Sequence, residues 1–246
     1  MSNDLTKPND QIAKRFAVGP KLSPLAQKMR AAAEATKSRE EVARTCDNRI
    51  VLILDDSGSM RESASGHYGS GTSKQEYARR AAEAFVDSID FDSTSVAIVG
   101  MNKTIKTPLM VDPALLISEL QRYNCPGQTP LFESISSVIN SIPLTRGILI
   151  SDGEATDRNA ESASSEQAVL LAKEAGIAFD CVHIGSSAGG EDTLKTIAKE
   201  TGGIYIKFKN AAAFVEALTY LTPQKRAKLF LTGGAALLKG ADEVIL

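Results

Sequence analysis

The chain has 246 residues, a formal net charge of −2, 43% hydrophobic residues and 24% charged residues. This length suits one domain with extensions, and the composition is that of an ordinary globular protein. A nucleic-acid-binding protein usually carries an excess of basic residues, so the charge argues against that class. No apolar stretch reaches the roughly 20 residues that a membrane-spanning helix needs, so we expect no membrane partner.

The N-terminal stretch and the cysteines bear on the cellular compartment. The first residues, MSNDLTKPNDQIAKRF, are polar and lack the apolar core of a signal peptide. The three cysteines, Cys46, Cys125 and Cys181, are sparse, odd in number and without CxxC spacing. Such cysteines are typical of a reducing compartment. The sequence therefore predicts a cytoplasmic protein.

Three parts are expected along the chain. Residues 1–47 form a helical extension, in which Ser23 is the expected N-cap and Pro24 the first helical residue. Residues 48–221 hold the main domain, and residues 222–246 form a C-terminal tail that ends in the apolar residues VIL.

The main domain alternates strand and helix patterns. Apolar runs such as VLIL and GILI lack period-two alternation, which is typical of parallel strands buried on both faces. The expected strands are Ile50–Leu54, Ser95–Met101, Thr104–Met110, Gly147–Ile150, Phe179–Ile184 and Gly203–Phe208. The expected helices cover residues 74–89, 113–123, 130–142, 164–176 and 192–202. This rhythm predicts a doubly wound, mostly parallel six-stranded α/β sheet with helices on both faces, a Rossmann-like fold.

One pair of strands departs from this rhythm. Only Asn102 and Lys103 separate Ser95–Met101 from Thr104–Met110. Two residues are too few for a crossover helix, but they suit a hairpin. We therefore expect Thr104–Met110 to be the one antiparallel edge strand.

Oxygen-bearing side chains gather where the strands of this sheet are expected to end. Ligands of open parallel sheets bind beyond the carboxyl ends of the strands. The side chains there are Asp55, Ser57 and Ser59 after the first strand, Thr129 in the turn before a later helix, and Asp152 after the strand that follows this helix. Two carboxylates and three hydroxyls are hard donors, which suit Mg²⁺, Mn²⁺ or Ca²⁺ better than Zn²⁺. The pattern therefore predicts a divalent-cation site.

The charge of this donor set indicates what the ion can do. Two aspartates balance the charge of a divalent ion, and the neutral hydroxyls add no further negative charge. If the aspartates act through water, the ion stays electrophilic, and an open coordination position can accept a carboxylate from outside. Glycines at positions 58, 127 and 153 are expected to let the backbone bend closely around the site.

These residues resemble a known family. D-x-S-x-S (Asp55, Ser57, Ser59), a lone Thr129 and S-D-G (residues 151–153) occur in the order found in the von Willebrand factor type A domain with an intact metal-ion-dependent adhesion site. The resemblance covers about residues 48–221. It implies that the two serines and the threonine coordinate the ion directly, that the aspartates act directly or through water, and that a partner's Glu or Asp completes the coordination. Cytoplasmic bacterial and phage-like members often work with AAA+ ATPases, so such an ATPase is an expected partner.

Further residues near the expected site are open to two interpretations. The segment RESASGHYGSGTSK (61–74) is long and rich in Gly and Ser. It is either a mobile flap whose bulky groups, His67 and Tyr68, contact the partner, or an ordinary surface loop. Glu154 is a candidate at the rim of the site. We expect Asp56 to be a loop residue rather than a sixth ligand, and His183 to be a packed core residue.

Three functions fit these observations. The first is a metal-dependent binding module, an intracellular adapter or assembly factor that grips an acidic side chain of a partner protein. The second is a metal-dependent phosphohydrolase, which would need a nucleophile, a general base or a second metal. No candidate base joins the cluster, so we expect no enzyme. The third is a structural subunit whose extensions build an assembly while the metal stabilises the loops. The sequence favours the binding module.

Overall fold

The computed structural model describes residues 23–63, 71–102, 104–153, 155, 165–185, 188–208, 218–232 and 241–245. The chain divides into two compact units, Met1–Arg39 and Glu40–Leu246. Apart from Ser23, the described residues of the first unit belong to helix α2 (Pro24–Thr45), whose last residues belong to the second. The predicted N-cap is confirmed, because Oγ of Ser23 accepts the backbone N–H of Ala26 at 3.2 Å.

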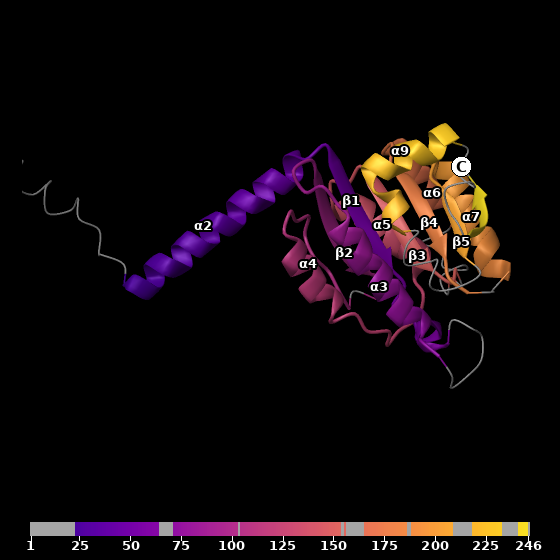
Figure 1. Ribbon diagram of the computed structural model, residues 1–246, viewed down its shortest axis with the longest axis horizontal. Coiled ribbons are helices and arrows are strands. Elements are labelled where there is room, and N and C mark those ends of the chain that lie inside the picture. The colour runs from indigo at the N-terminus through magenta and orange to yellow at the C-terminus, as the bar shows by residue number, and fades with distance from the viewer. Residues whose placement is uncertain are drawn as a thin grey trace, which may run out of the picture. The chain divides into compact units, whose positions relative to one another are not determined.

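The second unit is built on one six-stranded sheet (Figure 1). Its strands are β1 (Asn48–Leu54), β2 (Thr94–Gly100), β3 (Arg146–Ser151), β4 (Ala178–His183), β5 (Tyr205–Phe208) and β6 (Ala241–Ile245). Their order across the sheet is β2-β1-β3-β4-β5-β6. The first five are parallel, and β6 runs antiparallel to β5. The predicted fold class is therefore confirmed.

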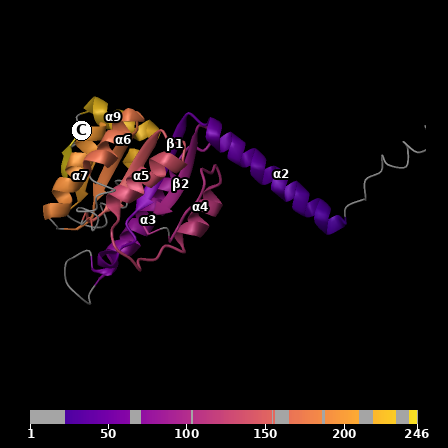
Figure 2. The ribbon, with the colours of Figure 1, turned by 180° about the vertical axis from the view of Figure 1, so that it is seen from behind.

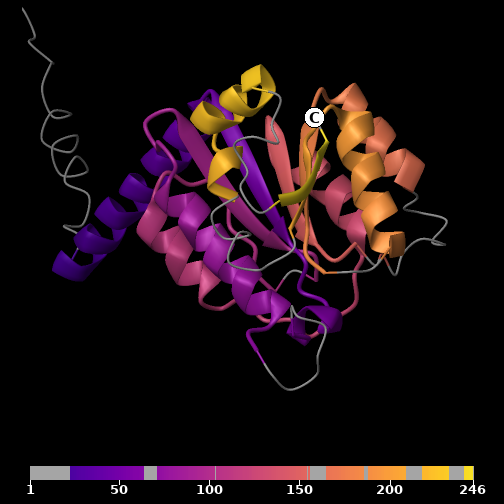
Figure 3. The same ribbon diagram turned by 45° about the vertical axis from the view of Figure 1, so that its right-hand side comes forward.

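Helices cover both faces of the sheet (Figure 2, Figure 3). They are α3 (Lys74–Asp87), α4 (Pro113–Leu120), α5 (Leu131–Ser141), α6 (Ser165–Glu174), α7 (Ala188–Thr201) and α9 (Pro223–Thr232), with the 3-10 turns η1 (Gly58–Arg61) and η2 (Thr219–Leu221). Alternate residues of a strand point to opposite faces. Ile50, Leu52 and Leu54 of β1 accordingly pack in one core with α3, α4 and η2. Val51 and Ile53 pack in the other core with α5, α6 and α7.

The antiparallel edge strand is not the predicted one. Residues 104–110 pair with β2 through two isolated antiparallel bridges, Val99 with Lys106 and Val96 with Met110. Between these bridges the backbone N–H of Ile98 donates to the Thr107 hydroxyl at 2.8 Å, and Pro108 has no N–H to donate. The pairing is therefore broken into short pieces. The antiparallel strand comes instead from the tail, whose β6 covers the free edge of β5.

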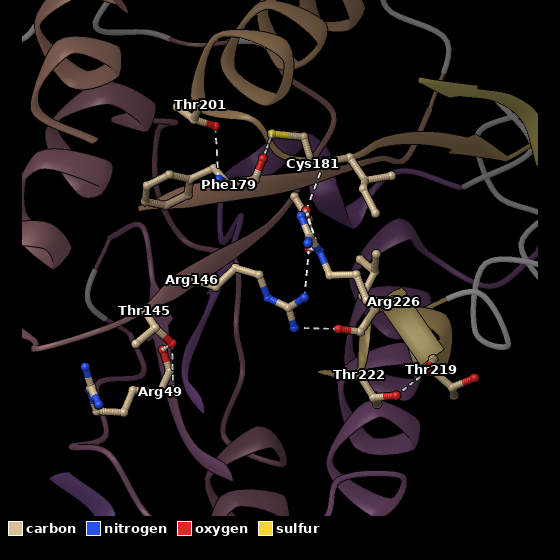
Figure 4. Close-up of polar contacts among 12 residues, drawn as sticks. Arg49, Thr145, Arg146, Phe179, Cys181, Thr201, Thr219, Thr222 and Arg226 are labelled. Atoms are coloured by element: carbon tan, nitrogen blue, oxygen red, sulfur yellow. Dashed lines mark hydrogen bonds and ion pairs between the residues drawn. The ribbon is translucent and has the colours of Figure 1, made fainter. Parts of the chain in front are cut away.

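A buried ionic cluster joins the C-terminal segment to the sheet. Asp180 of β4 is fully buried and accepts hydrogen bonds from Nε and Nη2 of Arg226 on α9, both at 2.9 Å. Arg146, the first residue of β3, lies 3.4 Å from the same carboxylate and donates to the Leu221 carbonyl at 2.6 Å. Figure 4 shows both guanidinium groups at this cluster. The tail that we expected as an extension thus contributes to the second unit.

Candidate metal centre

The loop after β1 places two hydroxyl groups side by side. Backbone pairing with β3 continues one residue beyond the strand, because the N–H of Asp55 donates to the Ile150 carbonyl at 2.9 Å. Oδ1 of Asp55 accepts the N–H of Ser57 at 3.0 Å, which closes a tight turn. The Oγ atoms of Ser57 and Ser59 lie 2.9 Å apart. Ser57 makes no side-chain cap to the following 3-10 turn, so its hydroxyl does not serve as a helix cap.

The loop that carries Thr129 is tied to this first loop. The N–H of Gly58 donates to the Gly127 carbonyl at 2.8 Å, and Ser57 and Gly127 form a parallel bridge. A Cβ atom on Gly127 would lie 2.4 Å from the side chain of Asn102, which would have to shift from its hydrogen bond with Asp56 to make room. Gly58 has room for a Cβ atom, with the nearest contact at 3.8 Å, so the expected need for glycine is not seen at that position. Thr129 is buried two residues beyond Gly127.

The loop after β3 reaches the same place. Oγ of Ser151 donates to Oδ2 of Asp55 at 2.5 Å and accepts the N–H of Gly153 at 2.8 Å. Gly153 has a φ angle of 78°, a conformation that favours glycine. Asp152 lies between them and is 2% exposed. The structure thus ties the loops of Asp152 and Thr129 to the loop of Asp55, Ser57 and Ser59.

The two carboxylates lie in an environment that favours a bound cation. Burial is the largest cause that raises the pKa of Asp55, to about 6, and the charge of Asp152 also raises this pKa. Hydrogen bonds from Ser151 and Ser57 act in the opposite direction and lower it. Nζ of Lys74 lies 3.2 Å from Oδ2 of Asp152. A buried carboxylate is stabilised by a nearby positive charge; the Lys74 ammonium group supplies one to Asp152, and no such group contacts Asp55 among the described residues.

Asp56 has a structural role that its position in the sequence did not reveal. It is fully buried, and Oδ1 accepts hydrogen bonds from the backbone N–H and the Nδ2 group of Asn102 at 2.7 and 2.8 Å. Oδ2 accepts hydrogen bonds from the backbone N–H and the hydroxyl of Thr104. Asp56 therefore holds the turn after β2 against the site through both of its carboxylate oxygens.

Two further residues at the site were absent from the predicted set. Ser151 stands in the S-D-G motif, where its contact with Asp55 could have been suspected from the motif alone. Lys74 begins a helix 78 residues before Asp152, and no local pattern links the two. Sequence reasoning also named His67, Tyr68 and Glu154, which lie outside the described residues.

His183 lies behind the site as a packed core residue, as predicted. It is fully buried, and its Nδ1 atom lies 3.0 Å from the hydroxyl oxygen of Tyr205. Burial lowers the pKa of His183, so the imidazole is neutral at pH 7. The three cysteines are buried and unpaired.

The donor set fits a hard divalent cation. Within the described ranges, no group of three or more His, Cys, Asp or Glu side chains is arranged to hold a metal ion. The candidate centre instead combines two carboxylates, Asp55 and Asp152, with the hydroxyls of Ser57, Ser59 and Thr129. All of these donors are oxygen atoms, which suit Mg²⁺, Mn²⁺ or Ca²⁺. Metal binding by these five residues stays a prediction.

The family model of the von Willebrand factor type A domain matches residues 49–220. The chain belongs to this family. The match spans β1 to η2 and so contains all five predicted ligands of the type A domain. A search of curated protein sequences finds no match.

Solved structures share the fold of this type A domain at low sequence identity. A von Willebrand factor type A protein from Catenulispora acidiphila is 20% identical, with a TM-score of 0.60 over 73% of this chain and 43% of that one. An aerotolerance-related membrane protein from Bacteroides fragilis is 19% identical, with a TM-score of 0.57 over 74% and 99%. The corresponding domain of the type V pili tip protein Mfa5 from Porphyromonas gingivalis is 13% identical, with a TM-score of 0.56 over 77% and 96%.

None of the helices in the described part of the chain combines the length and the hydrophobicity needed to cross a bilayer.

Proposed function

We propose that this type A domain is a metal-dependent protein-binding module. A divalent cation, Mg²⁺ by preference and otherwise Mn²⁺ or Ca²⁺, is held by Asp55, Ser57, Ser59, Thr129 and Asp152. A Glu or Asp side chain of a partner protein completes its coordination. Membership of a family whose domains commonly mediate protein–protein interaction supports this function.

The observation that carries the proposal is the junction of three loops at the carboxyl ends of β1 and β3. Ser151 joins Asp55 to the loop of Asp152, and Gly127 joins the loop of Thr129 to Gly58. These contacts gather hard oxygen donors from segments far apart in the sequence. The only histidine among the described residues, His183, is fully buried and cannot meet a substrate from solvent, so we propose binding rather than catalysis.

The proposed setting follows from the resemblance to cytoplasmic members of the family. In that setting the protein is an adapter or assembly factor, and an AAA+ ATPase is a candidate partner. The partner in this setting presents an exposed acidic side chain to the cation.

Capture of a partner from native lysate tests the proposal. Wild-type protein on beads should retain a partner when Mg²⁺ is present in excess over its Kd and lose it with a chelator. Asp55→Ala should fold and retain no partner. Asp92→Ala is the matched control, because Asp92 is exposed in the turn before β2, at the opposite end of the strands. Retention that is indifferent to both the chelator and Asp55→Ala would contradict the proposal.

A further inference from the structure

Lys74, the first residue of α3, places its ammonium group against a predicted metal ligand. Nζ lies 3.2 Å from Oδ2 of Asp152 and 3.5 Å from Oε2 of Glu62. The Lys74 side chain is 12% exposed and the Asp152 side chain 2%, so solvent and salt screen this ion pair less than they screen a surface pair. The Glu62 side chain is 43% exposed and lies on the solvent side of the group.

The backbone holds Lys74 in this position. Its N–H donates to the Glu62 carbonyl at 2.9 Å, and Ser63 and Ser73 form an antiparallel bridge. Ser73 also caps α3, because its Oγ atom accepts the N–H of Glu76 at 3.2 Å. With this backbone fixed, the Lys74 side chain can move from a position between the two carboxylates to one on Glu62 alone by rotation about its own bonds.

A divalent ion at Asp152 and the Lys74 ammonium would repel each other. Two positive charges within contact distance of one carboxylate destabilise each other, most strongly where water is scarce. The ammonium must therefore move off Asp152 when a cation binds there. Glu62, which already lies 3.5 Å from Nζ, can then hold the ammonium group by itself.

We propose that Lys74 is a built-in competitor for the divalent cation. It bridges Asp152 and Glu62 in the metal-free protein, and when the ion binds it leaves Asp152 and pairs with Glu62 alone. This inference rests on the proposed function and describes how the same site is regulated. Its consequence is that the protein binds the cation more weakly than its ligands alone would, and that binding changes the contacts of Glu62 and Lys74 at the start of α3.

Calorimetric titration of the full chain with MgCl₂ tests the inference. Lys74→Met keeps the apolar stem and removes the charge, and it should tighten Mg²⁺ binding about tenfold, which corresponds to about 1.4 kcal/mol. Lys225→Met is the charge-matched control. Its Nζ atom contacts Oγ1 of Thr219 at 3.3 Å on the segment of η2 and α9, so the affinity should not change.

Glu62→Gln provides an independent test. The Glu62 side chain is half-exposed, so removal of its charge does not threaten the fold. It should weaken Mg²⁺ binding several-fold when Lys74 is present, because the displaced ammonium loses its acceptor, and it should have no effect in the Lys74→Met background. This dependence of one substitution on the other is the signature of exchange, which a merely structural role of either residue would not produce.

The two possible failures are distinguishable. Equal or weaker Mg²⁺ binding by Lys74→Met, with binding by wild type intact, would overturn the competitor role and leave the proposed metal site standing. Silent titrations of both wild type and Lys74→Met, repeated with MnCl₂ and CaCl₂, would overturn the proposed function and this inference with it.

Discussion

Oγ of Ser151 donates a hydrogen bond of 2.5 Å to Oδ2 of Asp55, across 96 positions of sequence. The same oxygen accepts the N–H of Gly153 at 2.8 Å. One hydroxyl therefore orients the carboxylate of Asp55 and shapes the turn that carries Asp152.

Removal of this hydroxyl should disturb metal binding more than folding. We expect Ser151→Ala to weaken Mg²⁺ binding by about 10- to 100-fold, the range seen when a group that orients a metal ligand is lost. The free energy of unfolding should fall by only about 1–3 kcal/mol. Titration calorimetry and urea denaturation measure the two effects. Ser151→Thr, which keeps the hydroxyl, is the control, and wild-type affinity in Ser151→Ala would show that the hydrogen bond does not position the ligand.

The stability of the metal-free protein should depend on the protonation of Asp55. Burial raises the pKa of this carboxyl from 3.8 to about 6 in the folded protein. Folding therefore favours the neutral form, so the stabilisation is complete below the unfolded-state pKa and is lost as the pH rises through about 6. Asp55→Asn imitates the neutral form at every pH. Relative to wild type, this variant should gain on the order of 3 kcal/mol between pH 4 and pH 8.

Urea denaturation in the presence of chelator, at both pH values, measures this difference. The comparison with Asp55→Asn cancels the titration of the other carboxyl groups. Addition of Mg²⁺ at pH 8 should stabilise wild type and leave the variant unchanged. A difference in stability that is the same at both pH values would mean that the carboxyl of Asp55 titrates as an exposed group does.

The first turn of α7 packs on the backbone of Asp152. A Cβ atom on Gly190 would lie 2.1 Å from the Asp152 carbonyl oxygen, and neither backbone can give way without moving the loop. We expect Gly190→Ala to shift Asp152 and to abolish or strongly weaken Mg²⁺ binding. Gly58→Ala is the matched control within the site itself, because its Cβ atom would have room. Equal metal affinity of the two variants in calorimetry would contradict this account.

The ionic cluster of Asp180, Arg146 and Arg226 should matter for stability and not for the metal. Asp180→Asn leaves two guanidinium groups without their shared carboxylate in a buried place, and we expect a loss of about 3–5 kcal/mol. Arg226→Met should be milder, because Arg146 still pairs with Asp180. Urea denaturation measures the loss of stability in both variants. Hydrogen exchange over residues 223–232 should increase in each of them. If Asp180→Asn lowers the free energy of unfolding by no more than Arg226→Met does, this account of the cluster is wrong.

The fold and much of the site could be predicted because they depend on local patterns. The uninterrupted apolar run Ile50–Leu54 and the polar residues directly after it define both a buried strand and its exit. The same holds for Gly147–Ile150 and Asp152. Since parallel strands end at one edge of a sheet, these two local signals already place Asp55 and Asp152 near each other.

The identity of the antiparallel edge strand could not be predicted in this way. Residues 104–110 have the length and the short connection of a hairpin strand, but Pro108 and the Thr107 hydroxyl interrupt the ladder with β2. The five residues of β6 mix polar and apolar side chains, and this pattern is too short to predict a strand. They form a strand because β5 offers an unpaired edge, and Lys195 on α7 pairs with Glu243 at 2.7 Å.

The amino-acid sequence by itself determined the βα order, the positions where strands end and the oxygen donors placed there, because each depends on neighbours within a few residues. The tertiary structure alone decided that Ser151 orients Asp55, that Asp56 holds the turn after β2, and that Lys74 contacts Asp152. Those contacts join residues 46 to 96 positions apart. They arise only once the crossover connections have brought the strand ends together, and no periodicity along the chain encodes them.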